Sequence, residues 1–338
     1  MVQRRALKRE HSVARPAWRG SARWTATSVI GATLLWYLLF LALGDGGRLI
    51  GYVNAFGFWW AIVAMVAAGW LATDRAWLRS AVGIVLGIVI LTHGGVAIGR
   101  RPAVTNDAPT IRLVTASLRT SNHDMEAAAA MILAETPDLI VAQEVDVPAF
   151  TRALGRRSRG WSIVRRGNEL VACRCPISGV EGPGHVLRAR AALPSGPVTV
   201  WSLHAPKSYG RTVAQRVFFN ALAADIDAHR PGILAGDFNA TPWNDGYRII
   251  ADVYRDTWLA AGRGPGFTFP TGARRAGSLF PYIRIDHVFA SRDLIPIESR
   301  LGTSSAGADH LPLVVTFAMP SRRNRIDAGT RSSAKSTR

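Results

Sequence analysis

The sequence contains few cysteines. Two occur among 338 residues, which is too few for a disulfide framework or a zinc ribbon. Both lie in the run Cys173-Arg174-Cys175. On a strand their side chains would point to opposite faces, so we expect two small core residues and no disulfide between them. The thiols therefore give no indication of the redox compartment.

Acidic residues are also scarce: 23 Asp and Glu face 41 Lys and Arg, and the formal net charge is +18. Such an excess suggests a nucleic-acid partner, but it is concentrated at the two ends. Residues 1–26 hold seven basic residues against Glu10, and residues 321–338 hold six against Asp327. Because both ends are poor in apolar residues, we expect disordered basic tails at 1–26 and 320–338.

Charge is absent from long segments in the first hundred residues. Segments 28–44 and 53–73 are uncharged, and segment 80–99 is apolar apart from one histidine. Each approaches the roughly 20 residues that cross a bilayer, so we predict three transmembrane helices within 27–99. The alternative, buried helices of a soluble domain, is disfavoured by three such segments in succession. A signal peptide is disfavoured because two further spans follow the first.

Basic residues in the flanks predict the orientation of these spans. The N-terminus carries most of them and is expected in the cytoplasm, as the tail at 1–26. The first connection, 45–51, has one Arg, whereas 74–79 has two. Everything after residue 100 is then extracytoplasmic, on a multi-pass protein of the plasma membrane. Arg100 and Arg101 oppose this orientation weakly. His93, in the third span, is expected to be a packing or interface residue.

From Ile111 onwards the pattern changes to short apolar runs that alternate with helical segments. We predict strands at 111–118, 138–145, 169–177, 198–205, 232–238, 282–291 and 311–319, and helices at 123–137 and 211–229. Alternating strands and helices, followed by hairpin-like strands, indicate a layered α/β or α+β domain over 111–319. The run 100–110, with two prolines, is the expected linker.

Polar residues occur where these strands end. They are Gln143, Glu144, His204, Asp237, Asn239, Asp286, His287, Asp309 and His310. A turn alone explains any one of them, because Asp and Asn favour turns; this holds for Gly236-Asp237-Phe238-Asn239 taken alone. Five occurrences at the same edge indicate a functional site instead.

Metal-assisted attack of water on a phosphate requires side chains of these types. Mg²⁺, or Mn²⁺ in its place, takes oxygen ligands and acts as a Lewis acid on phosphoryl oxygens. Glu144 is the candidate metal ligand, Asp237 the group that orients or deprotonates water, and Asn239 a neutral donor. His310, oriented by Asp286, can donate to a phosphate oxygen or to the leaving group.

Five motifs together resemble the endonuclease/exonuclease/phosphatase (DNase I-like) superfamily. They are QEV at 143–145, SLH at 202–204, GDFN at 236–239, IDHVFAS at 285–291 and DHLP at 309–312. The resemblance covers about residues 110–319, with the motifs in the family's order. It implies a four-layer α/β sandwich, two packed β-sheets flanked by helices, with the strand-end residues meeting at one edge.

The resemblance also implies roles for individual residues. The catalytic set is Asp237, Asn239, His310, Asp286 and His204; the metal set is Glu144 and Asp309; and the supporting set is Gln143, Ser117 and Glu169. Within these sets, Asp237 positions the attacking water, Asp286 orients His310, and His204 is a second proton donor that Glu169 would orient. His287 has no role and is expected to be a packing residue.

The sequence departs from the family pattern at two positions. Many members have an asparagine in the first strand, where this chain has Ser117, which can still donate a hydrogen bond but reaches less far towards a metal-bound water. The frequent Ser-Asp-His run is Ala308-Asp309-His310 here. Neither departure removes a central catalytic group.

The substrate is expected from the architecture. Three spans followed by this domain are similar to actinobacterial membrane proteins related to the teicoplanin-resistance protein, a group associated with dephosphorylating the undecaprenyl pyrophosphate carrier of cell-wall synthesis. We therefore expect a membrane-anchored, Mg²⁺-dependent hydrolase of a phosphate ester or pyrophosphate, with the bilayer and a lipid-linked substrate as partners.

Two alternatives remain open. One is a tethered extracellular nuclease, for which phosphate contacts would dominate affinity. Its candidate nucleic-acid contacts are Arg156, Arg157, Arg159, Arg165 and Arg166, which a solvated loop also explains. The other is a non-catalytic binding protein with this fold, which the intact strand-end residues argue against.

Overall fold

A computed structural model describes residues 17–47, 49–99, 108–207, 212–272 and 280–319. The chain divides into two compact units, which are described separately. The first is formed by the chain up to Leu39 and by Phe58–Ile90, and the second by Phe40–Gly57 and the chain from Leu91 onwards. Residues 1–16 of the expected N-terminal tail, the tail at 320–338 and most of the linker lie outside the described residues.

The N-terminal part is helical. Its elements are α1 (Ala17–Leu43), α2 (Ile50–Asn54), α3 (Gly57–Thr73) and α4 (Trp77–Gly94). By length and composition, two helices could cross a membrane, over Gly20–Leu43 and Trp77–Gly94, whereas α3 is a shorter apolar helix of 17 residues. Of the three expected spans, two therefore have the full length.

The boundaries in this part correct three expectations. Residues 17–26 belong to α1 and are not part of a disordered tail. Segment 53–73 is divided between α2 and α3. The third expected span corresponds to α4, which ends at Gly94 rather than at residue 99. The next residue, Gly95, has a φ of +68°, the left-handed conformation that commonly ends helices. Residues 97–98 then form strand β1.

The second unit is built on two six-stranded sheets. The first has the order β13-β14-β2-β3-β5-β4, and the second has the order β10-β12-β9-β8-β7-β6. The strands of the first sheet are β2 (Thr110–Ser117), β3 (Leu139–Gln143), β4 (Ser162–Arg166), β5 (Glu169–Cys173), β13 (Ile295–Leu301) and β14 (Leu313–Ala318). Those of the second are β6 (Ile177–Glu181), β7 (Leu187–Leu193), β8 (Gly196–His204), β9 (Gly232–Asp237), β10 (Arg255–Asp256) and β12 (Asp286–Ala290). Strand β1 (Ala97–Ile98) pairs separately with β11 (Arg263–Gly264).

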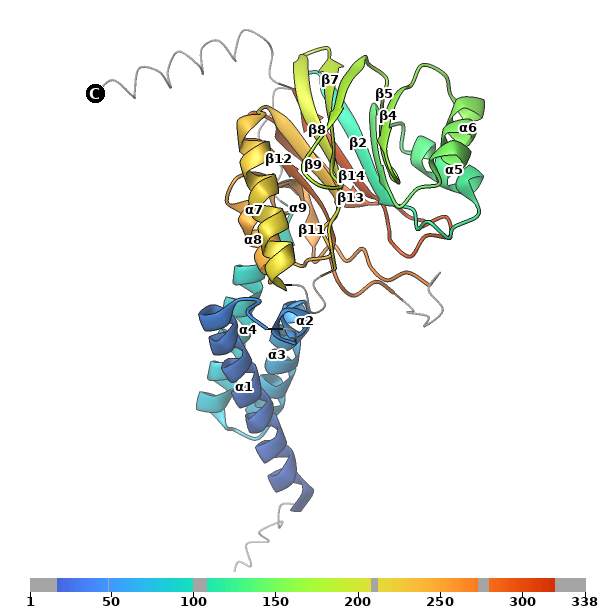
Figure 1. The fold of residues 1–338 in the computed structure, drawn as a ribbon. Helices are drawn as coiled ribbons and strands as arrows, with labels where there is room; N and C mark the ends of the chain where they lie inside the picture. The colour runs from blue at the N-terminus through green and yellow to red at the C-terminus, as the bar shows by residue number, and fades with distance from the viewer. Residues whose placement is uncertain (1–16, 48, 100–107, 208–211, 273–279, 320–338) are drawn as a thin grey trace, which may run out of the picture. The chain divides into compact units, whose positions relative to one another are not determined.

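Helices cover the outer faces of the two sheets (Figure 1). On the first sheet they are α5 (Met125–Ala134) and α6 (Val147–Arg157). On the second they are α7 (Thr212–Ala228) and α8 (Asp245–Ala251), and a short helix, α9 (Thr257–Ala261), follows β10. The expected four-layer order, helix on sheet on sheet on helix, is therefore present.

The side chains of the central strands point alternately to two buried faces, which explains why these strands are apolar throughout. In β9, Ile233 and Ala235 point into the core between the sheets, while Leu234 points to the helices outside. In β3, Leu139 lies between the sheets and Ile140 beneath α5 and α6. Because both faces of these strands are buried, a polar side chain is best accommodated where a strand ends.

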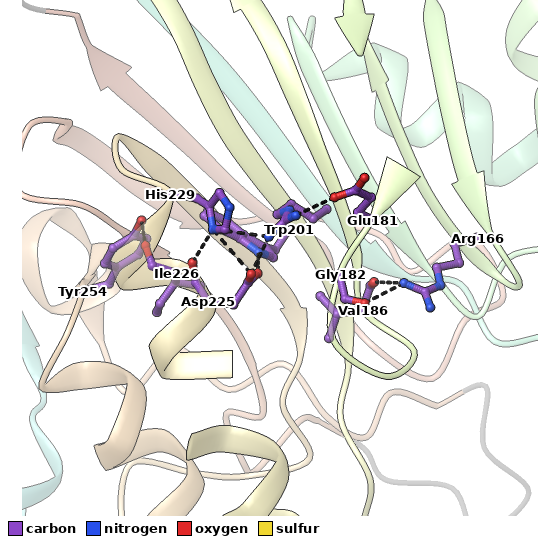
Figure 2. Close-up of polar contacts among 10 residues, drawn as sticks. Arg166, Glu181, Gly182, Val186, Trp201, Asp225, Ile226, His229 and Tyr254 are labelled. Atoms are coloured by element: carbon purple, nitrogen blue, oxygen red, sulfur yellow. Dashed lines mark hydrogen bonds and ion pairs between the residues drawn. The ribbon is translucent and has the colours of Figure 1, made fainter. Parts of the chain in front are cut away.

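Polar contacts fasten the outer helix and the strand edges of the second sheet (Figure 2). Asp225 of α7 accepts a hydrogen bond of 2.7 Å from the indole N–H of Trp201 and forms an ion pair with Arg188. Arg166 at the end of β4 donates to the carbonyl oxygens of Gly182 and Val186, at 2.8 and 3.2 Å. A residue of the first sheet thus forms hydrogen bonds with the β6–β7 connection of the second sheet.

The two cysteines correct another expectation. Cys173 and Cys175 form a disulfide, with a Cα–Cα separation of 5.0 Å. The argument from opposite strand faces does not apply, because β5 ends at Cys173 and Cys175 lies in the bend that follows.

Replacing Asp225, the acceptor on α7, tests these polar contacts. In Asp225→Asn, one of two carboxylate oxygens becomes a donor that faces Trp201 or Arg188, so we expect about 1–3 kcal/mol of lost stability by thermal unfolding. The control is Asp227→Asn on the same helix, whose side chain is 64% exposed and pairs with Arg230. This variant is expected to stay within ~0.5 kcal/mol of the wild type. Equal losses in both variants would contradict the assignment.

Candidate active site

The register of β9 brings three of the expected site residues together. Asp237, the last residue of β9, pairs with His204 at the end of parallel β8 and with Asp286 at the start of antiparallel β12. All three therefore lie at one edge of the second sheet. Asp237 is 2% exposed, and burial raises its pKa to about 6, although His310 and His204 favour the charged form.

A buried pair of Asp286 and His310 adjoins this carboxylate. The Nδ1 of His310 lies 2.8 Å from Asp286 Oδ2, and both side chains are at most 5% exposed. Burial opposes charge on the imidazole, but the neighbouring Asp286 outweighs it and raises the pKa of His310 to about 9. Because Asp286 occupies Nδ1, Nε2 is the ring nitrogen left to donate to a substrate oxygen.

Glu144 and His204 form the more open side of the site. The Nε2 of His204 lies 3.3 Å from Glu144 Oε1 and 3.7 Å from Asp237 Oδ2. Glu144 follows β3 directly and has a φ of +50°, a conformation that non-glycine residues adopt rarely and that often marks functional sites. Both side chains are about 30% exposed or less, so a solute can reach them.

Asn239 is held close to Asp237 by the turn that follows β9. Its N–H donates to Asp237 Oδ1 at 2.8 Å, and its side-chain amide donates to the carbonyl oxygen of Ala205 at 2.8 Å. Its φ is +46°. Gly236 is required on steric grounds, because a Cβ there would lie 2.1 Å from the carbonyl oxygen of Leu203. The GDFN run is thus a turn that presents two polar side chains.

A buried polar chain supports the site between the two sheets. Gln143, at the end of β3, accepts from Thr115 at 3.3 Å and donates to Ser202 of β8 at 3.1 Å. Ser202 in turn donates to Glu169 of β5. Glu169 therefore contacts Ser202, and not His204 as expected; burial raises the pKa of Glu169 to about 8.

Ser202 and Thr115 were missed as supporting residues. Ser202 lies two positions before His204 on β8, so both side chains are on the same face of the strand. Once His204 was assigned to the site, this alternation could have identified Ser202 as its neighbour.

The remaining expected residues are less central. The hydroxyl of Ser117 is buried beside the register partner Gln143, and it has no hydrogen-bond partner among the described residues. Asp309 is only partly buried and belongs to neither cluster of metal-binding atoms described below, so its role as a metal ligand stays a prediction. His287 is fully buried between Phe238 and Tyr247, and burial lowers its pKa to about 3, which fits a neutral packing residue.

The side chains present fit a divalent cation. Two clusters, Glu144–His204–Asp237 and Asp237–Asp286–His310, each place one ligand atom per residue within 4.8 Å of the others. Carboxylates suit Mg²⁺ or Mn²⁺ better than an imidazole does. Glu144 is therefore the oxygen donor that would hold the ion, with Asp237 beside it.

The comparisons with known proteins agree with this geometry. A profile of the Endonuclease/Exonuclease/phosphatase family matches residues 111–310. The match spans more than half of the chain, and the chain belongs to this family. Its site is accordingly of the phosphoester-hydrolase type, and it holds acidic and histidine groups suited to the divalent metal on which the family typically depends. No curated protein sequence matches the chain.

Two solved structures show the same fold. One is an endonuclease/exonuclease/phosphatase from Bacteroides vulgatus, with a TM-score of 0.51 and 16% identity over 63% of this chain and 100% of that chain. The other is a family protein from Leptotrichia buccalis, with a TM-score of 0.50 and 16% identity over 61% of this chain and 99% of that chain. At this identity the likeness concerns the fold alone.

Glu169 offers a test of the buried chain. Its pKa is raised in the folded protein, so its contribution to stability is complete below about pH 4.5 and is lost as pH rises to about 8. The slope is at most ~1.4 kcal/mol per pH unit. In Glu169→Gln, measured by thermal unfolding in EDTA, we expect the difference from wild type to shift in favour of the variant between pH 5 and 8.

The matched control is Glu298→Gln, in which the side chain is 49% exposed. The difference from wild type should shift with pH by more for Glu169→Gln than for this control, because Glu169 is buried between the sheets. A pH-independent difference for Glu169→Gln would show that the pKa of Glu169 is not raised in the folded protein.

Proposed function

We propose that the chain is a membrane-anchored phosphoesterase that hydrolyses the phosphate ester or pyrophosphate of a lipid-linked substrate outside the cytoplasm. Undecaprenyl pyrophosphate is the leading candidate. Helices α1 and α4 are long enough to span a bilayer, and the 17 residues of α3 are at the lower limit of the required length. With all three helices spanning the bilayer, as we propose, the catalytic unit lies on the side opposite the basic N-terminus.

The observation that carries the lipid assignment is an aromatic row beside the site. Phe56, in the connection between α2 and α3, stacks on Tyr282 with ring centroids 6.3 Å apart. The backbone N–H of Tyr282 donates to the carbonyl of Phe269, whose ring lies 4.7 Å from that of His310. Phe280, two positions before Tyr282, is 59% exposed. These aromatic residues therefore lie between His310 and the α2–α3 connection, which suits a lipid chain that is longer than a few carbons.

The catalytic steps follow from the positions of the side chains. A bound divalent metal, held by Glu144 with Asp237 beside it, would supply Lewis acidity at the phosphoryl oxygens. Asp237, beside Glu144 and His204 at the end of β9, orients water and accepts its proton. His310, kept protonated by Asp286, donates from Nε2 to a substrate oxygen. Asn239 orients the water or the phosphate, and His204 is a second donor near Glu144.

The arginines considered for nucleic-acid binding support a nuclease less well. Arg156 and Arg157 form ion pairs with Glu126, and Arg166 donates to backbone carbonyls. These side chains are already engaged in contacts within the protein. A nuclease is therefore the second outcome of the activity test below.

The first experiment is an activity screen of the full chain in detergent, with and without Mg²⁺. The substrates are undecaprenyl pyrophosphate, sphingomyelin, an inositol phosphate and DNA. We expect phosphate release from the lipid pyrophosphate that EDTA abolishes and Mg²⁺ or Mn²⁺ restores. DNA cleavage that weakens steeply with salt, without phosphate release, would replace the lipid assignment by the nuclease.

Asp237→Ala tests the catalytic assignment. Removing the group that accepts the proton should lower kcat by about 10²–10⁴-fold. The exposed Asp293→Ala is the control and should stay within twofold of wild type. Unchanged activity in Asp237→Ala would show that the strand-end residues are not the catalytic centre, and a binding role for the fold would then be favoured.

Phe56→Ala tests the lipid assignment separately. We expect the KM for undecaprenyl pyrophosphate to rise about fivefold or more, because each buried CH₂ contributes ~0.8 kcal/mol to apolar contact. For dimethylallyl pyrophosphate, which has the same headgroup and only five carbons, kinetics should change less than twofold. An equal effect on both substrates would contradict an aromatic row that binds the lipid chain.

A further inference from the structure

The connection between α1 and α2 contains a buried aspartate that the phosphate chemistry does not use. Asp45 is 2% exposed, and residues 40–57 belong to the same compact unit as the strands of the active site. A carboxylate is buried at such cost only where hydrogen bonds compensate it. The partners of Asp45 therefore indicate what it holds.

Three donors surround the Asp45 carboxylate. Oδ1 accepts from the side-chain amides of Asn54 at 2.9 Å and Asn244 at 3.1 Å, and Oδ2 accepts from the backbone N–H of Asp245 at 2.7 Å. The contact with Asp245 is reciprocal, since the N–H of Asp45 donates to Asp245 Oδ2 at 3.1 Å. Two of the three donors lie about 200 positions away, in the loop that follows β9.

Asn244 connects Asp45 to the turn 241–244, which follows Asn239. Its Oδ1 accepts from both the N–H and the hydroxyl of Thr241, at 2.9 and 3.0 Å, and its own N–H donates to the carbonyl of Thr241. The same side chain also donates to the carbonyl of Gly51 at 2.8 Å. Asn244 therefore closes the turn 241–244 and fastens it to the α1–α2 connection. Only Ala240 separates this turn from Asn239.

Close packing fixes the same loop independently. The indole of Trp243 is 5% exposed and lies against two glycines at helix ends: a Cβ at Gly57 would come within 2.4 Å of it, and one at Gly94 within 2.0 Å. At Gly44, a Cβ would lie 2.7 Å from Asp245 Oδ1. Arg216 and Arg248 form ion pairs with the carboxylate of Asp245. The loop 240–245 thus packs closely against three glycines, Gly44, Gly57 and Gly94.

We propose that Asp45 is a positioning residue for catalysis, which holds the loop 240–245 so that Asn239 and Asp237 keep their places at the end of β9. The role rests on the proposed phosphoester hydrolysis, but it does not depend on whether the substrate is a lipid. It assigns a catalytic contribution to a residue of the helical, N-terminal part of the chain. A displacement of catalytic groups by ~1 Å can cost about 100-fold in rate.

The test is Asp45→Asn in the full-length protein, assayed with undecaprenyl pyrophosphate and with dimethylallyl pyrophosphate. Asparagine keeps the size of the side chain but presents an N–H₂ group to a donor. We expect kcat to fall about 10- to 100-fold on both substrates with KM changed less than twofold. The control is Asp74→Asn in the α3–α4 connection, where the aspartate pairs with Arg23, and kcat should stay within twofold of wild type.

Two further variants separate positioning from a loss of folding. Asp45→Asn/Asn244→Asp exchanges the two groups across the contact and should recover part of the lost kcat. Asn54→Ala removes one donor and leaves the contact with Asn244, so it should lower kcat by less than Asp45→Asn, and it is the variant to use if Asp45→Asn does not fold.

The outcomes decide between the two claims. If the wild type shows no activity, the proposed function fails. If the wild type is active and Asp45→Asn, or Asn54→Ala in its place, lowers the melting temperature while kcat per folded molecule is unchanged, the positioning role is overturned. A change in KM confined to the long-chain substrate would also overturn it, because it would show that Asp45 acts on Phe56 and not on the catalytic turn.

Discussion

The site depends on the register of β9 between its two neighbours in the second sheet. Because Asp237 pairs with His204 on one side and Asp286 on the other, the three side chains meet at one edge. A slip of one residue would turn Asp237 towards the opposite face and would also move Ile233 and Ala235 out of the core between the sheets. Packing of the core and assembly of the site are therefore specified by the same contacts.

Burial sets the protonation of the groups that this register collects. Asp237, Glu169 and His310 all lie where water is largely excluded, so neighbouring residues determine whether each group is charged. Asp286 keeps His310 protonated, and Ser202 donates a hydrogen bond to Glu169. Gln143 and Glu169 of the first sheet reach Ser202 of the second, so the site edge is also where polar contacts cross between the sheets. The loop after β9 is fastened in the same way, through Asn244 to Asp45.

The sequence predicted the central strands well, because β3 and β9 are buried on both faces and are continuously apolar. The edge strands β4 and β6 and the helices α6, α8 and α9 were not predicted; β6, for instance, is mostly exposed and gives no clear pattern. Site residues at strand ends were found because a charged residue after an apolar run is conspicuous. Asp45 was not found, because its partners are about 200 positions distant. Cys175 was misjudged because the end of β5 was placed too late.

The most direct test of a single metal-dependent centre at this edge is a crystal structure of the protein soaked with Mn²⁺, read from the anomalous scattering of the ion. The account predicts one Mn²⁺ with a carboxylate oxygen of Glu144 among its ligands, next to Asp237 and on the open side of the Asp286–His310 pair. An ion bound elsewhere, with neither Glu144 nor Asp237 in its coordination, would contradict it.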